Sequence, residues 1–115
     1  MEVSQLRPKD MAQALVLEMR APISFARDMQ TDADGGHLQG FIDALKEQNE
    51  RDELPNGDVL VREWIGVCGL ITPSNWAINQ IALKVIPALA VGAKCVLRPS
   101  EHMPSYAAIY AEIVD

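Results

Sequence analysis

The sequence predicts an α/β fold in which N-terminal helices precede a short parallel sheet of β-α-β-α order. Apolar residues recur at helical spacing before residue 50, and turn residues fill positions 55–58. Two short apolar runs then follow, each succeeded by another helical pattern. Strands that alternate with helices form parallel sheets, whose ligands lie beyond the carboxyl ends of the strands. We therefore expect a functional site in the loops at 72–76 and 98–102.

The composition is that of one soluble globular domain. The chain has 115 residues, of which 49% are hydrophobic and 23% charged, and this length is enough to enclose a single hydrophobic core. Ten Lys and Arg oppose sixteen Asp and Glu, which gives a formal net charge of −6. This balance attracts neither phosphate backbones nor anionic lipid, so we expect no nucleic-acid or membrane partner. The polar N-terminus carries no secretory signal, which predicts a cytoplasmic protein.

Two helices are predicted in the first third of the chain. Apolar spacing from Asp10 onward predicts a helix that ends near Arg20, because Pro22 forces the residue before it out of the helical region. Pro22 is itself suited to a first helical position, so a second helix should open there. We expect Gly35-Gly36 to break or kink this second helix.

A third helix and a turn complete the first half. The apolar residues of this helix lie on one face, at positions 38, 41, 42 and 45. The turn sequence Pro55–Asp58 divides a helical segment, 1–57, from a sheet-forming segment, 58–115. The acidic run Asp43–Asp58 is expected to be a solvated surface. Apolar and polar residues mostly alternate from Asp58 to Trp64, which predicts a half-exposed edge strand.

The second half predicts two further strands, each followed by a helix. Val67–Ile71 is a continuous apolar run rich in β-branched residues, as in a strand covered on both faces. A helical pattern follows over Ile78–Leu89, with Pro87 inside it. A second apolar run, Ala93–Leu97, and a second helical pattern over 106–113 complete the β-α-β-α order.

The cysteines and histidines form no recognisable site in the sequence. Cys68 and Cys95 each lie inside an apolar run and not at metal-ligand spacing, so we expect packing roles, without a disulfide or a zinc site. A thiolate is disfavoured in such a strand, which argues against either cysteine as a nucleophile. His37 and His102 have no partner at a useful spacing and are expected to be solvated or structural.

Three segments together resemble the aldehyde dehydrogenase superfamily. They are Gly66-Val-Cys-Gly-Leu-Ile-Thr-Pro-Ser-Asn-Trp-Ala, Lys84-Val-Ile-Pro-Ala-Leu-Ala-Val-Gly and Leu97-Arg-Pro-Ser-Glu101. The family has Gly-Val-x-x-x-Ile-Thr-Pro-Trp-Asn, Lys-x-x-Pro-Ala-Leu-x-x-Gly and Val-Leu-Lys-Pro-Ser-Glu in the same order and spacing. Upstream, Glu18-Met-Arg-Ala-Pro22 is similar to the family's Glu-x-Gly-x-Pro.

This resemblance implies the N-terminal portion of an NAD(P)-dependent aldehyde dehydrogenase. The chain would supply the N-terminal helices and part of a Rossmann-like cofactor domain. It looks truncated, because the family's nucleophilic Cys, general-base Glu and Gly-rich turn lie in segments beyond Asp115. A complete enzyme would oxidise an aldehyde to a carboxylic acid with NAD, or NADP, as cofactor. The chain alone is expected to be inactive.

The resemblance also implies individual site residues. Asn75 matches the asparagine whose amide stabilises the oxyanion formed when the catalytic thiolate attacks the aldehyde. From the local sequence alone, Asn75 is instead a helix N-cap or a turn residue. Ile71, Thr72 and Pro73 match the segment that lines the nicotinamide end of the cofactor.

Two further residues match the region around the adenosine ribose. Arg98 stands where the family usually has Lys, and Glu101 stands where a Glu accepts hydrogen bonds from the ribose hydroxyls. A carboxylate repels a 2′-phosphate, so Glu101 favours NAD over NADP, whereas the guanidinium of Arg98 favours a phosphate. Without the resemblance, Arg98 is a surface cation and Glu101 is an acid in the first turn or capping box of the last helix.

Four residues depart from the family pattern. Arg20 stands in place of Gly, Ser74 in place of Trp, and Ala77 in place of the second Pro, while Arg98 replaces Lys. Contacts with cofactor and substrate are expected to differ from the family's at these points.

A second function stays open, that of a non-catalytic α/β module that self-associates or pairs with a homologous chain. Two parallel strands and one edge strand leave apolar sheet faces uncovered, and exposed edges recruit partners. We therefore expect a dimer or larger homo-oligomer. Binding of NAD by the chain alone would favour the enzyme hypothesis.

Overall fold

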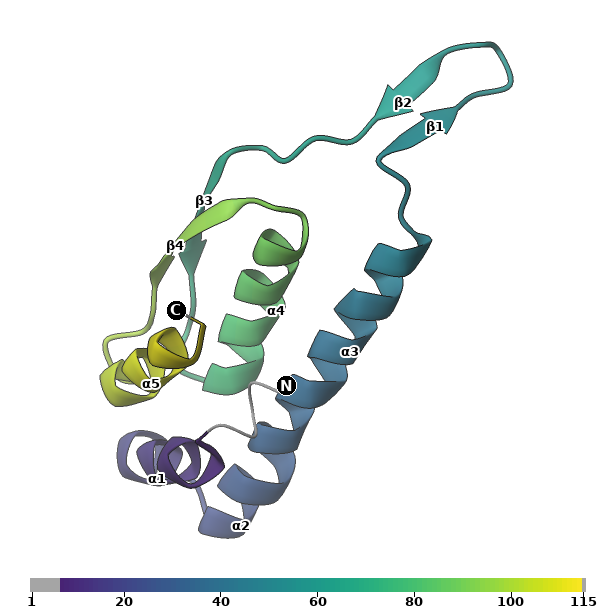
Figure 1. The fold of residues 1–115 in the computed structure, drawn as a ribbon. Coiled ribbons are helices and arrows are strands. Elements are labelled where there is room, and N and C mark those ends of the chain that lie inside the picture. The colour runs from purple at the N-terminus through teal and green to yellow at the C-terminus, as the bar shows by residue number, and fades with distance from the viewer. Residues whose placement is uncertain (1–6, 115) are drawn as a thin grey trace.

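A hairpin arm projects from a body of helices that covers one side of a two-stranded parallel sheet (Figure 1). The computed structural model describes residues 7–114, with the side chains of all of these except 29–35. The elements in chain order are α1 (Pro8–Met19), α2 (Ile23–Phe25), a π-helical turn (Ala26–Gln30), α3 (Thr31–Glu47), β1 (Arg51–Glu53), β2 (Val59–Val61), β3 (Val67–Ile71), α4 (Ala77–Ala90), β4 (Lys94–Arg98) and α5 (Pro104–Val114).

The first helix, α1, ends where the sequence predicts. Pro8 opens it, and Arg20 follows it with a φ of 55°, in the left-handed region. A left-handed backbone at a residue with a Cβ costs about 1–2 kcal/mol. The Glu-x-Gly-x-Pro motif that Glu18–Pro22 resembles has Gly at the position of Arg20, and Gly avoids that cost.

Gly35-Gly36 were predicted to break or kink a helix, and the break is wrong, because α3 continues through both glycines. The irregular turn lies earlier, at Ala26–Gln30, where the helix is of the π type. Each glycine costs a helix about 1 kcal/mol, and the packing of α3 along α4 compensates for this cost. His37, for which no partner was expected, contacts Asn79 of α4, with 2.5 Å between Nε2 and Oδ1.

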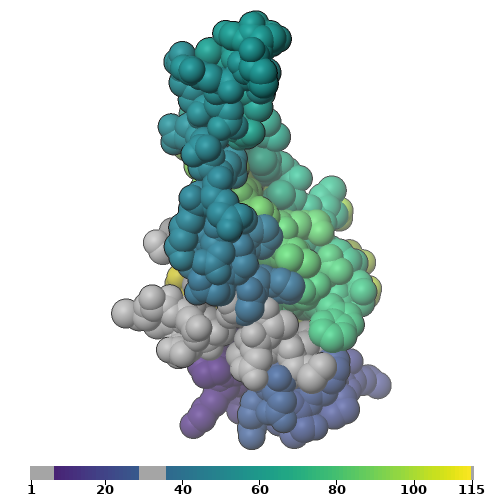
Figure 2. Space-filling view, turned by 90° about the vertical axis from the view of Figure 1, so that its right-hand side faces the viewer, coloured from purple at the N-terminus to yellow at the C-terminus, as the bar shows by residue number. Residues whose placement is uncertain are grey.

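The strand predicted from Asp58 to Trp64 shortens to β2 and does not join the parallel strands, contrary to the prediction of an edge strand there. It pairs antiparallel with β1 to form the arm, which Figure 2 shows standing clear of the body. The predicted turn is confirmed, since Gly57 has a φ of 87° and its N–H donates to the carbonyl of Leu54 at 2.9 Å. Arg62 bonds to the carboxylate of Asp52 at 2.5 Å and thereby lowers the pKa of Asp52.

The β-α-β-α order is confirmed in full. β3 and β4 are parallel, and α4 connects them with Pro87 inside the helix. The expectation that the first strand is covered on both faces is wrong for this chain. Val67 and Ile71 are 65% and 66% exposed, because in the described chain the helices pack on the opposite face of the sheet.

The hydrophobic core lies where α1, α4 and α5 meet. Its large, fully buried side chains come from these helices and the loop before α5: Met11, Leu15, Ile78, Ile81, Met103 and Tyr106. Leu70 and Leu97 reach the same core from the two parallel strands. None of the helices in the described part of the chain is long and apolar enough to cross a membrane.

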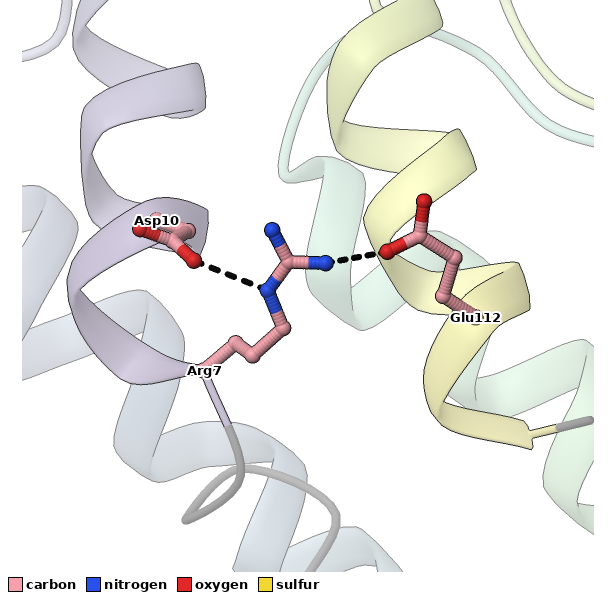
Figure 3. Close-up of polar contacts among 3 residues, drawn as sticks. All are labelled: Arg7, Asp10 and Glu112. Atoms are coloured by element: carbon pink, nitrogen blue, oxygen red, sulfur yellow. Dashed lines mark hydrogen bonds and ion pairs between the residues drawn. The ribbon is translucent and has the colours of Figure 1, made fainter.

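Polar contacts at both ends join α1 to α5. At one end, the carboxylate of Glu18 accepts hydrogen bonds from the backbone N–H groups of Ser105, at 2.7 Å, and Tyr106, at 3.2 Å. These N–H groups lie in the first turn of α5, the part of a helix whose backbone donors need acceptors from outside the regular helical pattern. At the other end, Arg7 bonds to Asp10 and to Glu112 of α5 (Figure 3). The two helices are therefore antiparallel and held together at both ends.

Replacing Glu18 by Gln is expected to lower the free energy of unfolding by about 1–2 kcal/mol. The amide retains one acceptor oxygen, but its NH₂ group faces a second N–H donor and the charge near the helix N-terminus is lost. Urea denaturation of the chain measures the change. Glu47→Gln, at the exposed end of α3, is the matched control and should leave stability within about 0.5 kcal/mol of the parent. Equal losses in both variants would refute the capping role.

Replacing Arg20 by Gly should have the opposite sign and raise stability by about 1 kcal/mol. The left-handed backbone strain disappears, and this gain exceeds the extra entropy that glycine gives to the unfolded chain. Arg27→Gly, in a right-handed helical turn, is the control and should destabilise by about 1 kcal/mol. A loss of stability in Arg20→Gly as well as in Arg27→Gly, measured by the same urea denaturation, would contradict the claim that the backbone at Arg20 is strained.

Candidate functional site

The two predicted ligand loops leave the same edge of the parallel sheet. Ile71, the last residue of β3, is the register partner of Arg98, the last residue of β4. Beyond this pair, the N–H of Thr72 donates to the carbonyl of Arg98 at 3.2 Å. The first residues of both loops are therefore held side by side, at the end of the sheet where open α/β folds bind their ligands.

The first loop presents Asn75 to solvent at the start of α4. Thr72 is buried at 5% exposure, whereas Pro73 and Asn75 are exposed. Trp76 occupies the N-cap position of α4 with a φ of 52°, so the alternative prediction that Asn75 caps this helix is wrong. Asn75 lies in the turn just before the cap. The ring of Trp76 packs edge-on against Phe25, with 5.5 Å between the centroids, which ties this loop to α2.

The second loop presents Arg98 and Glu101, both exposed. The Oγ of Ser100 accepts the N–H of His102 at 3.3 Å, and the carbonyl of Ser100 accepts the N–H of Met103 at 3.1 Å. Met103 is 2% exposed and anchors the end of the loop in the core. The loop is therefore fixed at both ends, with the carboxylate of Glu101 facing solvent.

Glu101 does not cap the last helix. α5 begins at Pro104 and has no acid in its first turn, so the alternative prediction for Glu101 is wrong. Glu18 supplies the carboxylate at that helix N-terminus instead. The local sequence around Glu18 gives no signal for this role, because its partners Ser105 and Tyr106 lie 87 and 88 positions away in the chain.

Two of the predicted site residues, Ile71 and Arg98, lie on the outer face of the sheet. Leu70 and Leu97 point into the core, so their neighbours Ile71 and Arg98 point to the outer face of the sheet. Asn75 and Glu101 follow in the loops. The arrangement offers an amide donor, a guanidinium and a carboxylate along one edge, a set suited to a ligand that carries a carbonyl and hydroxyl groups.

The sequence matches the aldehyde dehydrogenase family over residues 2–115. The chain is 45% identical over 107 residues to the 3-succinoylsemialdehyde-pyridine dehydrogenase of a Pseudomonas species, an overlap that covers 92% of this chain and 22% of that protein. An identity of this size over nearly the whole chain indicates that the chain has the same fold as the matching part of that protein.

Two solved structures have the same backbone arrangement. The aldehyde dehydrogenase of Bartonella henselae has a TM-score of 0.92 and 45% identity, with 98% of this chain and 24% of that one covered. A mutant of aldehyde dehydrogenase C from Pseudomonas syringae, complexed with NAD+ and octanal, has a TM-score of 0.91 and 42% identity, with 98% and 23% covered. The chain spans about a quarter of the length of these relatives, and it belongs to the aldehyde dehydrogenase family.

Proposed function

We propose that this chain supplies the oxyanion-stabilising and cofactor-lining part of an NAD-dependent enzyme that oxidises an aldehyde to a carboxylic acid. The observation that carries the proposal is the joint exit of the two loops from one sheet edge, secured by the bond between Thr72 and Arg98. Family membership and the complex of a similar enzyme with NAD+ and octanal support the same assignment.

Asn75 is the residue that we propose to act on the substrate. Its amide N–H donates to the aldehyde oxygen as negative charge develops there during attack by a thiolate. A neutral amide donates without itself losing a proton, and the N-terminus of α4 adds its positive dipole close by. Cys68 and Cys95 lie within β3 and β4, so we assign the thiolate to a segment outside this chain. The chain alone is then inactive.

The cofactor residues are proposed from the chemistry of the exposed groups. Glu101 accepts hydrogen bonds from the two hydroxyls of a ribose, and Arg98 lies at the same sheet edge. Ile71, Thr72 and Pro73 shape the path of the backbone toward the nicotinamide end. When bound, NAD+ supplies the acceptor for the hydride of the substrate. Segment 58–115 would thus form part of the cofactor domain, and segment 1–57 would support it.

A second candidate, a non-catalytic module that self-associates, rests on the uncovered face of the sheet. Val67, Ile71 and Val96 are 65%, 66% and 65% exposed there. Exposed apolar sheet surface favours association with further protein. We propose a cytoplasmic homo-oligomer under either candidate. The two differ in whether the face is covered by the remainder of an enzyme or by another copy of the chain.

The role of Asn75 is tested in a chimaera that joins this chain to the rest of the Pseudomonas 3-succinoylsemialdehyde-pyridine dehydrogenase. Replacement of Asn75 by Ala should lower kcat by about 10²- to 10³-fold, because one oxyanion donor is lost. Affinity for NAD+, measured by fluorescence titration, should stay unchanged. Asn49→Ala, in the loop before β1, is the matched control and should retain kcat. A folded Asn75 variant with less than about a tenfold loss would contradict the assignment.

Cofactor choice is tested at Glu101 in the same chimaera. The parent should bind NAD+ at least about tenfold more tightly than NADP+, because the carboxylate repels a 2′-phosphate. Glu101→Gln removes the charge and should lower the ratio of NAD+ affinity to NADP+ affinity. Glu53→Gln, in the arm, should leave this ratio unchanged. Equal affinities for both cofactors in the parent would rule out this role for Glu101.

A further inference from the structure

The two cysteines of the chain lie opposite each other on adjacent strands. Cys68 of β3 is the register partner of Cys95 of β4, and both are free thiols of intermediate burial. Register partners in a parallel pair project their side chains to the same face, and neighbouring strands are about 4.8 Å apart. In the sequence, each cysteine lies in its own apolar run, which predicts two separate packing residues. Their pairing appears only once the strand register is fixed.

The thiol pair lies on the helix-covered face of the sheet, with open space on either side. Leu70 and Leu97, which alternate with the cysteines, pack against the core from this face. Cys68 lines a cavity of about 620 Å³, together with Trp64. Cys95 lines a second cavity of about 430 Å³. A small solute can therefore approach either sulfur.

We propose that Cys68 and Cys95 form a two-thiolate site for a single soft metal ion. Two metal–sulfur bonds of about 2.3 Å placed end to end span about 4.6 Å, close to the spacing of the strands that carry the sulfurs. A disulfide instead needs Cβ atoms about 3.8 Å apart, which parallel side-chain directions do not favour. An ion between the sulfurs fits this register better than a direct bond.

The chemistry of the site selects the class of ion. A divalent ion displaces one proton from each thiol and forms two metal–sulfur bonds, so two protons are released and no oxidation state changes. Among the described residues, no group of three or more His, Cys, Asp or Glu side chains gathers around a metal-sized space. A soft divalent ion that accepts two thiolates, such as the mercuric ion, therefore suits the site, whereas zinc and calcium require more ligands.

The site is tested with mercuric ion added to the full chain in the presence of excess glutathione as a competing monothiol. Native mass spectrometry should show one ion per chain, and both thiols should be lost to a thiol-specific reagent. Cys68→Ser and Cys95→Ser should each weaken binding by at least about 100-fold, because the second thiolate acts at high effective concentration.

A matched variant separates the paired geometry from the mere presence of two thiols. Cys95→Ser combined with Val96→Cys keeps two thiols but moves one to the outer face, so tight binding should be lost. Val96→Cys alone retains the pair and should bind as tightly as the parent. Two ions per chain, one ion shared between two chains, or unchanged affinity in the double variant would each overturn the proposal. Circular dichroism establishes that every variant compared is folded.

Discussion

The carboxylate of Glu18 is the contact on which the arrangement of the rest of the chain depends. It joins the end of α1 to the first turn of α5, 87 positions later, by accepting hydrogen bonds from the backbone N–H groups of Ser105 and Tyr106. Arg7 and Glu112 join the opposite ends of the same helices. Because α5 follows β4 after one short loop, the position of α5 also fixes that loop. The N-terminal helices thereby support an edge of the sheet to which they contribute no strand.

The chain covers its sheet on one face only. Leu70 and Leu97 are partly buried against the helical core, whereas Val96 on the outer face is 65% exposed. The arm also exposes apolar side chains, among them Leu60 and Val61. Burial of apolar surface contributes about 25 cal/mol per Å², so such surfaces favour contact with further protein.

Local patterns in the sequence were enough to predict the elements whose own residues carry the signal. Periodic apolar positions predicted α1, α4 and α5, and the two apolar runs predicted β3 and β4. β1 consists of Arg51, Asp52 and Glu53, which carry no strand pattern, and it exists because β2 folds back on it. The capping by Glu18 and the pairing of the cysteines depend on contacts distant in sequence. The role of Asn75 came from family resemblance, because the local sequence alone favoured a helix cap that the structure assigns to Trp76.

The central claim is that the carboxyl edge of β3 and β4 holds substrate and cofactor. A crystal structure of the chimaeric enzyme with NAD+ and an aldehyde tests it most directly. The account predicts the amide nitrogen of Asn75 within hydrogen-bond distance of the aldehyde oxygen and the carboxylate of Glu101 on the ribose hydroxyls. An aldehyde bound away from Asn75, with the ribose away from Glu101, would contradict it.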